Sequence, residues 1–344
     1  MKQIPGCRFL LPICGIVLLL LLPAECGAGV RSGMKLCADA LIPSLFPVSV
    51  IAGCLLQMKP ERVAERLSGR WMKILFGLPG SCAVPFSLGL LGGFPLGAQL
   101  TATMYREGSL SRTEAIRLSM ICNNAGPAFL LGAVGGILGG QHYGATLFLI
   151  QLLSASLCGM LLLRPDALSL QDRCESQHPV SAFWDALPSA ISESVTGMLR
   201  LTGSVVFFSA VTACVSAILP LHCLPQAWAS IFSGILEVSA GIELLRGSIL
   251  QTAFPVAAFL VGWGGFCVHL QAAGVLHAVG LPVKPYLLGK LLQALISTLL
   301  AFVLLPMFTK TTPILFWLCL ISTGVLIFYA FLKKYHWKTA SPVL

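Results

Sequence analysis

Long runs of apolar residues, separated by short polar stretches, extend along most of the chain. Runs of about 20 apolar residues are long enough to cross the hydrocarbon core of a bilayer as helices. The pattern therefore predicts an all-α polytopic membrane protein. The expected segments lie at 9–22, 38–57, 81–104, 111–139, 142–163, 183–219, 228–245, 253–279, 285–308 and 313–332, the first of them retained as a helix.

The segment at 121–132 contains residues that a membrane helix normally lacks. Two amides, Asn123 and Asn124, precede Gly126 and Pro127. Pro127 removes one backbone donor and disfavours helical geometry at Gly126. Because broken backbone at membrane depth survives only beside protein or a watery cavity, the sequence predicts a broken helix and a binding site here.

Glycine and proline also punctuate the segment at 81–104. So many helix-breaking residues favour a re-entrant hairpin over a straight span. The residues are Pro85, Gly89, Gly92, Gly93, Pro95 and Gly97. Before this hairpin, charged and apolar positions interleave at 59–74 in the pattern of an amphipathic helix on the membrane surface, and its Lys and Arg residues place it in the cytoplasm.

Composition supports the membrane class and excludes several others. Hydrophobic residues make up 56% of the 344 residues, charged residues only 10%, and the mean hydropathy is +0.88. The net charge of +9 comes from Lys and Arg in short loops, which set topology in membranes, so no nucleic-acid partner is expected. The 13 cysteines are scattered singly without a CxxC pair, which predicts packing residues and no metal or other cofactor.

The second half of the chain resembles the first in the order of its elements. Each half contains a span, a glycine-rich hairpin, a broken helix and another span. We therefore predict an N-terminal helix and loop (1–37), a first transport repeat (38–163), a cytoplasmic linker (164–182), a second repeat (183–308), and a C-terminal helix with a basic tail (309–344). The residues at 124–126 then correspond to Trp263, Gly264 and Gly265.

The distribution of positive charge predicts the orientation of the two halves. If the first hairpin enters from the cytoplasm and the second from outside, most of the 22 Lys and Arg lie inside, and Arg200 remains within the membrane. The halves are then antiparallel. This inverted repeat is the architecture of secondary transporters.

Three first-half motifs resemble those of a known family. They are LGGFPLGA at 91–98, YREG at 105–108 and CNNAGPAF at 122–129. They are similar to the YlbJ-type (SpoVV) sporulation integral membrane proteins of the nucleoside-recognition or Gate superfamily, which is distantly similar to concentrative nucleoside transporters. The resemblance covers about residues 38–308. It implies a location in the outer forespore membrane and a role in the passage of dipicolinic acid, a small aromatic dicarboxylate.

The breaks and hairpin tips supply the candidate substrate-binding residues. Broken helices present free N–H groups and the positive end of a half-helix dipole to an anion, and amides add donors without a fixed charge. Alternatively, the amides only cap the break and bond to neighbouring backbone. The candidates are Asn123, Asn124, Gly126, Gly93, Gly97, Gln99, Gly264 and Gly265.

Charged residues within apolar segments form a second group of candidates. Arg200 could clamp a substrate carboxylate, pair with Glu193 on the same helical face, or extend to the membrane interface. Glu237 and Glu243 flank the turn of the second hairpin and could bind a coupling ion or proton, or serve as structural hydrogen-bonding groups. His269 and His277 are expected to pack or face a lumen, because no third metal ligand accompanies them.

We therefore expect an alternating-access transporter and not an enzyme, since no nucleophile, base and orienting group can be assembled from the motifs. The expected partners are the lipid bilayer and dipicolinate. Two alternatives stay open at this point. One is transport of a nucleoside-like or other small polar metabolite, and the other is a non-transporting membrane assembly factor for sporulation. The sequence leaves a homo-oligomer open.

Overall fold

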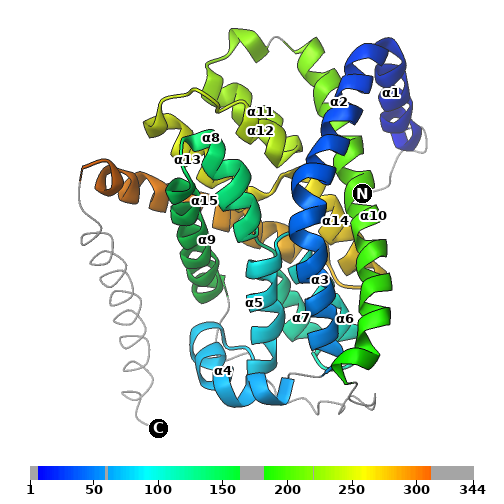
Figure 1. Ribbon diagram of the computed structural model, residues 1–344, viewed down its shortest axis with the longest axis vertical. Coiled ribbons are helices and arrows are strands. Elements are labelled where there is room, and N and C mark those ends of the chain that lie inside the picture. Colours follow the sequence, from blue (N-terminus) through cyan, green and yellow to red (C-terminus); the bar gives the residue numbers. More distant parts are fainter. Residues whose placement is uncertain (1–6, 59–60, 163–181, 220, 311–344) are drawn as a thin grey trace.

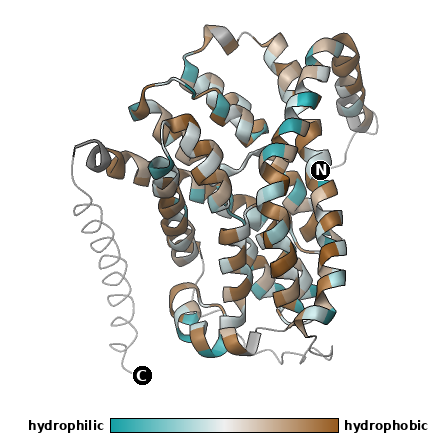
Figure 2. Ribbon diagram, in the orientation of Figure 1, coloured by the Kyte–Doolittle hydropathy of each residue, from teal (hydrophilic) through white to brown (hydrophobic). Residues whose placement is uncertain are grey.

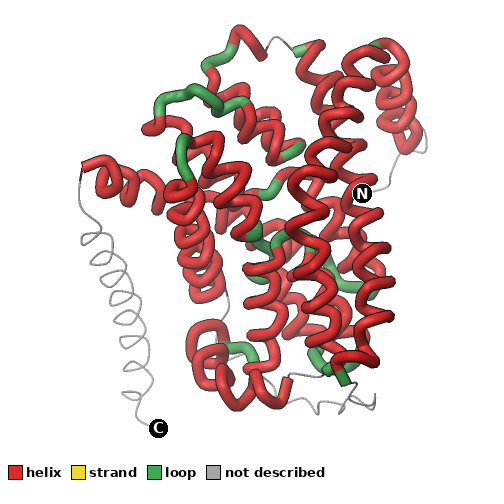
Figure 3. Tube along the Cα trace, viewed as in Figure 1, coloured by secondary structure: helices red, strands yellow, loops and turns green. Residues whose placement is uncertain are grey.

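The computed structural model describes residues 7–58, 61–162, 182–219 and 221–310, and within these ranges the chain folds into helices without a strand (Figures 1 and 3). Two short π-helical turns, η1 (Cys37–Leu41) and η3 (Phe129–Val134), and two 3₁₀ turns, η2 (Gly80–Cys82) and η5 (Leu221–Cys223), accompany the α-helices. The α-helices are α1 (Cys7–Leu21), α2 (Pro23–Leu36), α3 (Ile42–Gln57), α4 (Glu61–Phe76), α5 (Ala83–Gly92), α6 (Leu96–Arg106), α7 (Arg112–Ser119), α8 (Gly135–Leu138), α9 (Gln141–Leu162), α10 (Phe183–Ile218), α11 (Gln226–Leu236), α12 (Val238–Glu243), α13 (Leu250–Trp263), α14 (Gly265–Ala278) and α15 (Val283–Lys310).

Apolar residues dominate these helices, as Figure 2 shows. By length and composition, five helical stretches of the described chain could cross a membrane, or six if the bent pair at 63–92 counts as one. The predicted all-α polytopic membrane class is therefore confirmed. The expected helix at 313–332, the basic tail and nearly all of the linker at 164–182 lie outside the described residues.

The first long span differs from its prediction. It was expected to begin at residue 38, but it runs through α2, η1 and α3 as Pro23–Gln57. Glu25, Arg31 and Lys35 lower the hydropathy of α2, yet this segment stays helical because its glycine face packs against α10. The proline at position 43 stands in the first turn of α3, where its missing N–H is tolerated.

The helices α2 and α3 lie along α10 over nearly its whole length (Figure 1). A Cβ at Gly29 would lie 2.7 Å from the Cα of Ala210, and one at Gly53 would lie 3.2 Å from the Cβ of Ala190. The contact moves backward along α10 as it moves forward from α2 to α3, so the two long helices are antiparallel. Small residues permit this close approach, as is common between membrane helices.

A second antiparallel pair consists of α9 and α15. The Ser297 hydroxyl bonds to the Ser154 hydroxyl at 2.8 Å, and the Cys158 thiol donates to the Gly289 carbonyl at 3.4 Å. The numbering again runs in opposite directions along the two helices. Hydroxyl pairs of this kind hold neighbouring helices together where no water is available.

Two hairpins lie between these long helices. In the first, formed by α5 and α6, a Cβ at Gly89 would meet the Cα of Gly97 at 2.8 Å. In the second, formed by α11 and α12, a Cβ at Gly241 would meet the Cα of Gly234. Both hairpins therefore bring their arms together through a pair of glycines, as the helix-breaking residues predict for the first.

Before the first hairpin, α4 is bent by 92° from the helix that follows it. Its apolar side chains Val63, Leu67 and Trp71 are exposed, while Met72 and Phe76 on the other face are buried. This geometry agrees with the predicted surface helix, because the exposed apolar face is available to the bilayer.

Candidate functional site

The first break lies where the sequence predicts it. The helix α7 begins with a capping box of Ser111 and Glu114 and ends at Ser119, and residues 123–126 have no helical structure. The tip of the first hairpin packs against this break, since a Cβ at Gly93 would lie 2.9 Å from the Gly126 nitrogen. Gly93 has φ +81°, which only glycine adopts readily, so both the turn and the contact require glycine here.

The second break separates α13 from α14 at Gly264 and Gly265, whose φ values are +92° and +76°. The tip of the second hairpin packs against it, since a Cβ at Gly265 would lie 3.1 Å from the Val238 nitrogen. Phe94 reaches this break from the first hairpin, with its Cζ 3.3 Å from a Cβ built on Gly264. The two predicted breaks and the two hairpin tips therefore meet at the centre of the molecule.

A cavity of about 50 Å³ lies at this meeting point. At about 15 Å³ per water, it has room for about three water molecules. Both halves contribute to its wall, with Leu41 and Leu45 from the first span and Leu201 and Val205 from α10 completing it. The central lining comprises Gly93, Phe94, Ala125, Gly126, Phe129, Glu237, Val238, Ser239, Cys267, Val268 and Gln271.

A wider vestibule of about 500 Å³ lies between η1–α3 and η3. It shares Leu41 and Phe129 with the wall of the central cavity. Its remaining lining is mixed, with Asp39 and Ser44 among apolar residues. A volume of this size suits a small ligand.

The amides of the first break are buried in a polar network. The Asn124 side chain donates to the Ile121 carbonyl at 2.8 Å and accepts from Gln293 Nε2 at 2.7 Å. Asn123 Nδ2 donates to the Tyr286 hydroxyl at 3.3 Å, and this hydroxyl also bonds to His269 Nδ1 at 3.1 Å. The network therefore ties the first break to α14 and α15.

Lys290 lies at the centre of the same network. Its side chain is fully buried, and its ammonium donates to the Asn123 carbonyl at 2.9 Å and to Gln293 Oε1 at 2.8 Å. The ammonium also lies 5.3 Å from the centre of the Phe94 ring. Phe94 also lines the cavity, whereas Lys290 does not.

On the opposite wall, Glu237 fixes the tip of the second hairpin. Its carboxylate accepts from the backbone N–H groups of Ser239 at 3.0 Å and Ala240 at 2.7 Å, and so caps α12. The side chain is 3% exposed and lines the cavity. Because both backbone donors bond to Glu237, they are not free to hold an anion.

Of the predicted site residues, Gly93, Gly126 and Glu237 line the cavity. Asn123, Asn124, Gly264 and Gly265 lie at the two breaks beside it, and four others lie farther away. Gly97 packs against the Cys122 carbonyl, and Gln99 points toward Gly197 on α10. Arg200 is exposed near the middle of α10 and makes no ion pair with Glu193 in the described chain. Glu243 is also exposed.

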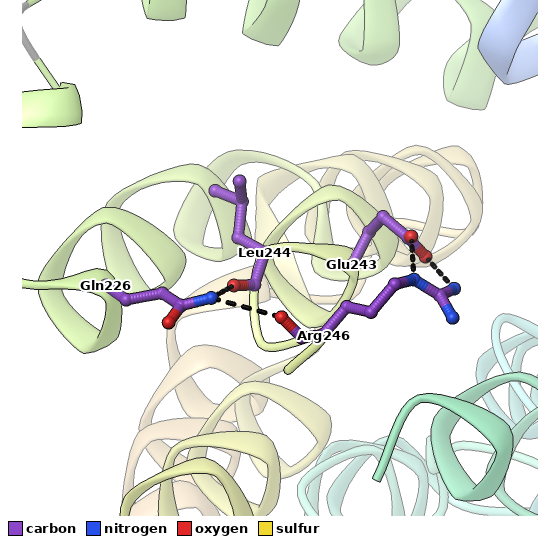
Figure 4. Close-up of polar contacts among 4 residues, drawn as sticks. All are labelled: Gln226, Glu243, Leu244 and Arg246. Atoms are coloured by element: carbon purple, nitrogen blue, oxygen red, sulfur yellow. Dashed lines mark hydrogen bonds and ion pairs between the residues drawn. The ribbon is translucent and has the colours of Figure 1, made fainter. Parts of the chain in front are cut away.

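Figure 4 shows where Glu243 points. Its carboxylate accepts two hydrogen bonds from the Arg246 guanidinium, at 2.6 and 2.9 Å, and these bonds raise the pKa of Arg246. Gln226 lies nearby and donates from its amide to the carbonyls of Leu244 and Arg246. This cluster closes the base of the second hairpin and does not face the central cavity.

Sequence reasoning missed Tyr286, Lys290 and Gln293. The prediction of orientation from Lys and Arg counted Lys290 among the residues of loops. In the structure, Lys290 is buried within α15. A signal was present, because these three residues are spaced by four and three positions and so share one face of an apolar helix. A polar stripe on one face of a membrane helix marks a buried network.

Comparisons with known proteins agree with this architecture. No family model and no solved structure matches the chain. Among curated proteins, the chain is similar to the sporulation integral membrane protein YlbJ of Bacillus subtilis (strain 168). The two are 28% identical over 324 residues, which cover 81% of this chain and 78% of YlbJ. This similarity confirms the YlbJ-type resemblance of the sequence motifs and, with the helices described above, indicates a multi-pass integral membrane protein of sporulation.

Proposed function

We propose that the protein is a transporter that moves a small solute through its central cavity by alternating access. The observation that carries this proposal is the central cavity, whose wall includes both hairpin tips, the first break and residues of α14 that follow the second break. Non-helical backbone at membrane depth is typical of transporter binding sites. The vestibule supplies access from one side, so movement of Leu41 and Phe129 would join it to the cavity.

Contacts in the two halves support an inverted repeat. In each half, glycines join the arms of a hairpin, and the tip of that hairpin packs against the break of the following helix. Ser154 and Ser297 lie on the last helix of each proposed repeat and bond to each other. An atom pair of this kind is expected where a two-fold axis relates the halves.

Dipicolinic acid is the first candidate substrate, following the YlbJ-type resemblance, and the outer forespore membrane is the proposed location. The cavity is too small for an aromatic dicarboxylate in the closed state, so binding requires the hairpin tips to separate. Phe94 and Phe129 would offer aromatic faces to a planar ring. Glu237 on the same wall favours coupling to a proton or cation that offsets its charge.

A nucleoside-like solute is the second candidate. The buried amides of Asn123 and Asn124, together with Gln271 on the cavity wall, could exchange their present bonds for bonds to a neutral polar ring. A non-transporting assembly role would require no central cavity between the halves, and the cavity therefore favours transport over that role.

Uptake by the purified full-length chain in liposomes tests the proposal. We expect dipicolinate to accumulate, and we expect Gly126→Val to abolish uptake because a side chain there meets the first hairpin tip. Gly136→Ala is the matched control, since a Cβ at Gly136 has nothing within 4 Å. If liposomes with the wild-type protein take up neither dipicolinate nor uridine, the transport proposal is wrong.

A further inference from the structure

The buried ammonium of Lys290 has no charged partner among the residues that the structure describes. Its hydrogen bonds go to two neutral oxygen atoms, the Asn123 carbonyl and Gln293 Oε1. An ammonium has three donors and is stable away from water only when its charge is offset. Within the described ranges, the third donor has no hydrogen-bond acceptor.

Phe94 contacts both this ammonium and the central cavity. The ring lines the cavity, which Lys290 does not, and its centre lies 5.3 Å from Lys290 Nζ. A cation over an aromatic face is stabilised by about 1 to 2 kcal/mol, which is less than a carboxylate partner provides. Phe94 stands at the tip of the first hairpin, so it moves when that tip moves.

Two more buried polar atoms near Lys290 lack partners. Asn123 Oδ1 and His269 Nε2 have no hydrogen bond, although both side chains are at most 4% exposed. Both residues bond to Tyr286 through their other polar atoms. Buried polar atoms without partners are costly, so two of them in the network of one buried cation point to a ligand group there.

We propose that Lys290 is the group that binds a carboxylate of the transported solute, and that Phe94 is the gate that covers it until the solute enters. When the hairpin tip moves, the ring leaves the ammonium and a carboxylate takes its place. This inference rests on the proposed transport function and names the residue that selects anionic solutes. It also explains how a cavity bordered by Glu237 could accept an anion, since the carboxylate binds on the opposite side.

The test uses the full-length chain in nanodiscs and two probes of similar shape, pyridine-2,6-dicarboxylate and the neutral pyridine-2,6-dicarboxamide. We expect Lys290→Met to weaken binding of the dicarboxylate about ten- to hundredfold, the loss of one charge-assisted hydrogen bond. Binding of the dicarboxamide should change less than about twofold, since it carries no charge. Lys284→Met, an exposed lysine on the same helix, is the matched control and should bind like the wild type.

A second variant tests the gate and remains informative if Lys290→Met fails to fold. Phe94→Ala uncovers the ammonium, so it should bind the dicarboxylate more tightly than the wild type, because the ring no longer has to be displaced. Combining Phe94→Ala with Lys290→Met should remove that gain. Unchanged dicarboxylate binding in either single variant would overturn the inference.

The outcomes also separate this inference from the transport proposal. If the wild type takes up uridine but binds no dicarboxylate, Lys290 is not an anion site, while transport stands. If the dicarboxylate binds through Lys290 but no solute crosses the liposome membrane, the transport proposal fails, and Lys290 cannot select a transported solute.

Discussion

The two hairpin tips share a backbone arrangement but differ in chemistry. The first tip consists of Gly93 and Phe94 and contributes no polar side chain to the cavity, while its break holds Asn123, Asn124 and the Lys290 ammonium. The second tip carries Glu237, which caps its own helix, and its break consists of glycines. A positive charge therefore lies behind the first tip, and a negative charge lies on the second tip.

This difference shows how one frame can serve two tasks. The glycine contacts fix where each tip meets its break, and they require no particular chemistry. The side chains added to that frame then determine what each half recognises. If the proposed transport function holds, we expect a solute between the two tips to be oriented by Lys290 on one side and Glu237 on the other.

The largest expected effect comes from the glycines that form the shared frame. Gly97→Ala places a methyl group against the Cys122 carbonyl, and Gly241→Ala places one against the Cα of Gly234. Overpacking costs about 1 to 3 kcal/mol, so both variants should melt at a lower temperature or fail to fold. Thermal denaturation in detergent measures this, with Gly203→Ala on α10 as a control that meets nothing within 4 Å. If Gly97→Ala melted at the wild-type temperature, the two hairpins would not depend on the same kind of glycine contact.

The next effect concerns the amide pair, which exists only at the first break. Asn124→Ala and Gln293→Ala each leave a buried amide partner unsatisfied, at a cost of about 1 to 3 kcal/mol. A double-mutant cycle should give a coupling energy of about 0.5 kcal/mol or more between the two sites. Gln99→Ala is the control and should be nearly neutral. If the stability losses of Asn124→Ala and Gln293→Ala were additive, the hydrogen bond between these two side chains would not connect the halves.

A smaller effect is expected at Glu237, which has no counterpart at the first tip. Glu237→Ala removes the cap of α12 and should lower the free energy of unfolding by about 1 kcal/mol. Glu237→Gln keeps an oxygen acceptor for one N–H group and should cost less. Uptake measured from pH 5 to pH 8 should lose its pH dependence in Glu237→Gln if the carboxylate carries the coupling proton. An unchanged pH profile would leave Glu237 a structural cap only.

The smallest effect is expected for charges outside the cavity. Arg200→Lys keeps an exposed cation at the surface of α10, and Glu243→Gln breaks only the exposed pair with Arg246. Exposed pairs contribute little to stability, so both variants should transport and melt like the wild type. A strong loss of uptake in Arg200→Lys would instead support the interpretation that Arg200 binds a substrate carboxylate.

Much of the fold could be predicted because apolar runs and helix breakers are local signals. The break at 123–126 and the hairpin at 81–104 follow directly from amides, glycines and prolines in apolar surroundings. The helical stretch before residue 38 was missed because Arg31 and Lys35 lower its mean hydropathy. Mean hydropathy does not show on which face of the helix these residues lie. Gly29 and Gly33, four residues apart, were the signal for a packed helix.

The chemistry of the site was harder to predict than its position. Arg200 was singled out because its surroundings are apolar, yet it faces outward, whereas Lys290 was assigned to a loop and is buried. Hydropathy does not say which side of a helix faces the protein. Only the helical spacing of Tyr286, Lys290 and Gln293 carried that information.

The packing of α2 against α10 also has a consequence for how the chain is made. Gly29 and Gly33 have their contacts at Val206, Ser209 and Ala210, which leave the ribosome long after α2 has entered the membrane. Until then, a helix bearing Arg31 and Lys35 lies in the bilayer without its partner. A nascent chain stopped before residue 183 should therefore be degraded by membrane quality control, while one that extends beyond 219 can assemble this helix pair.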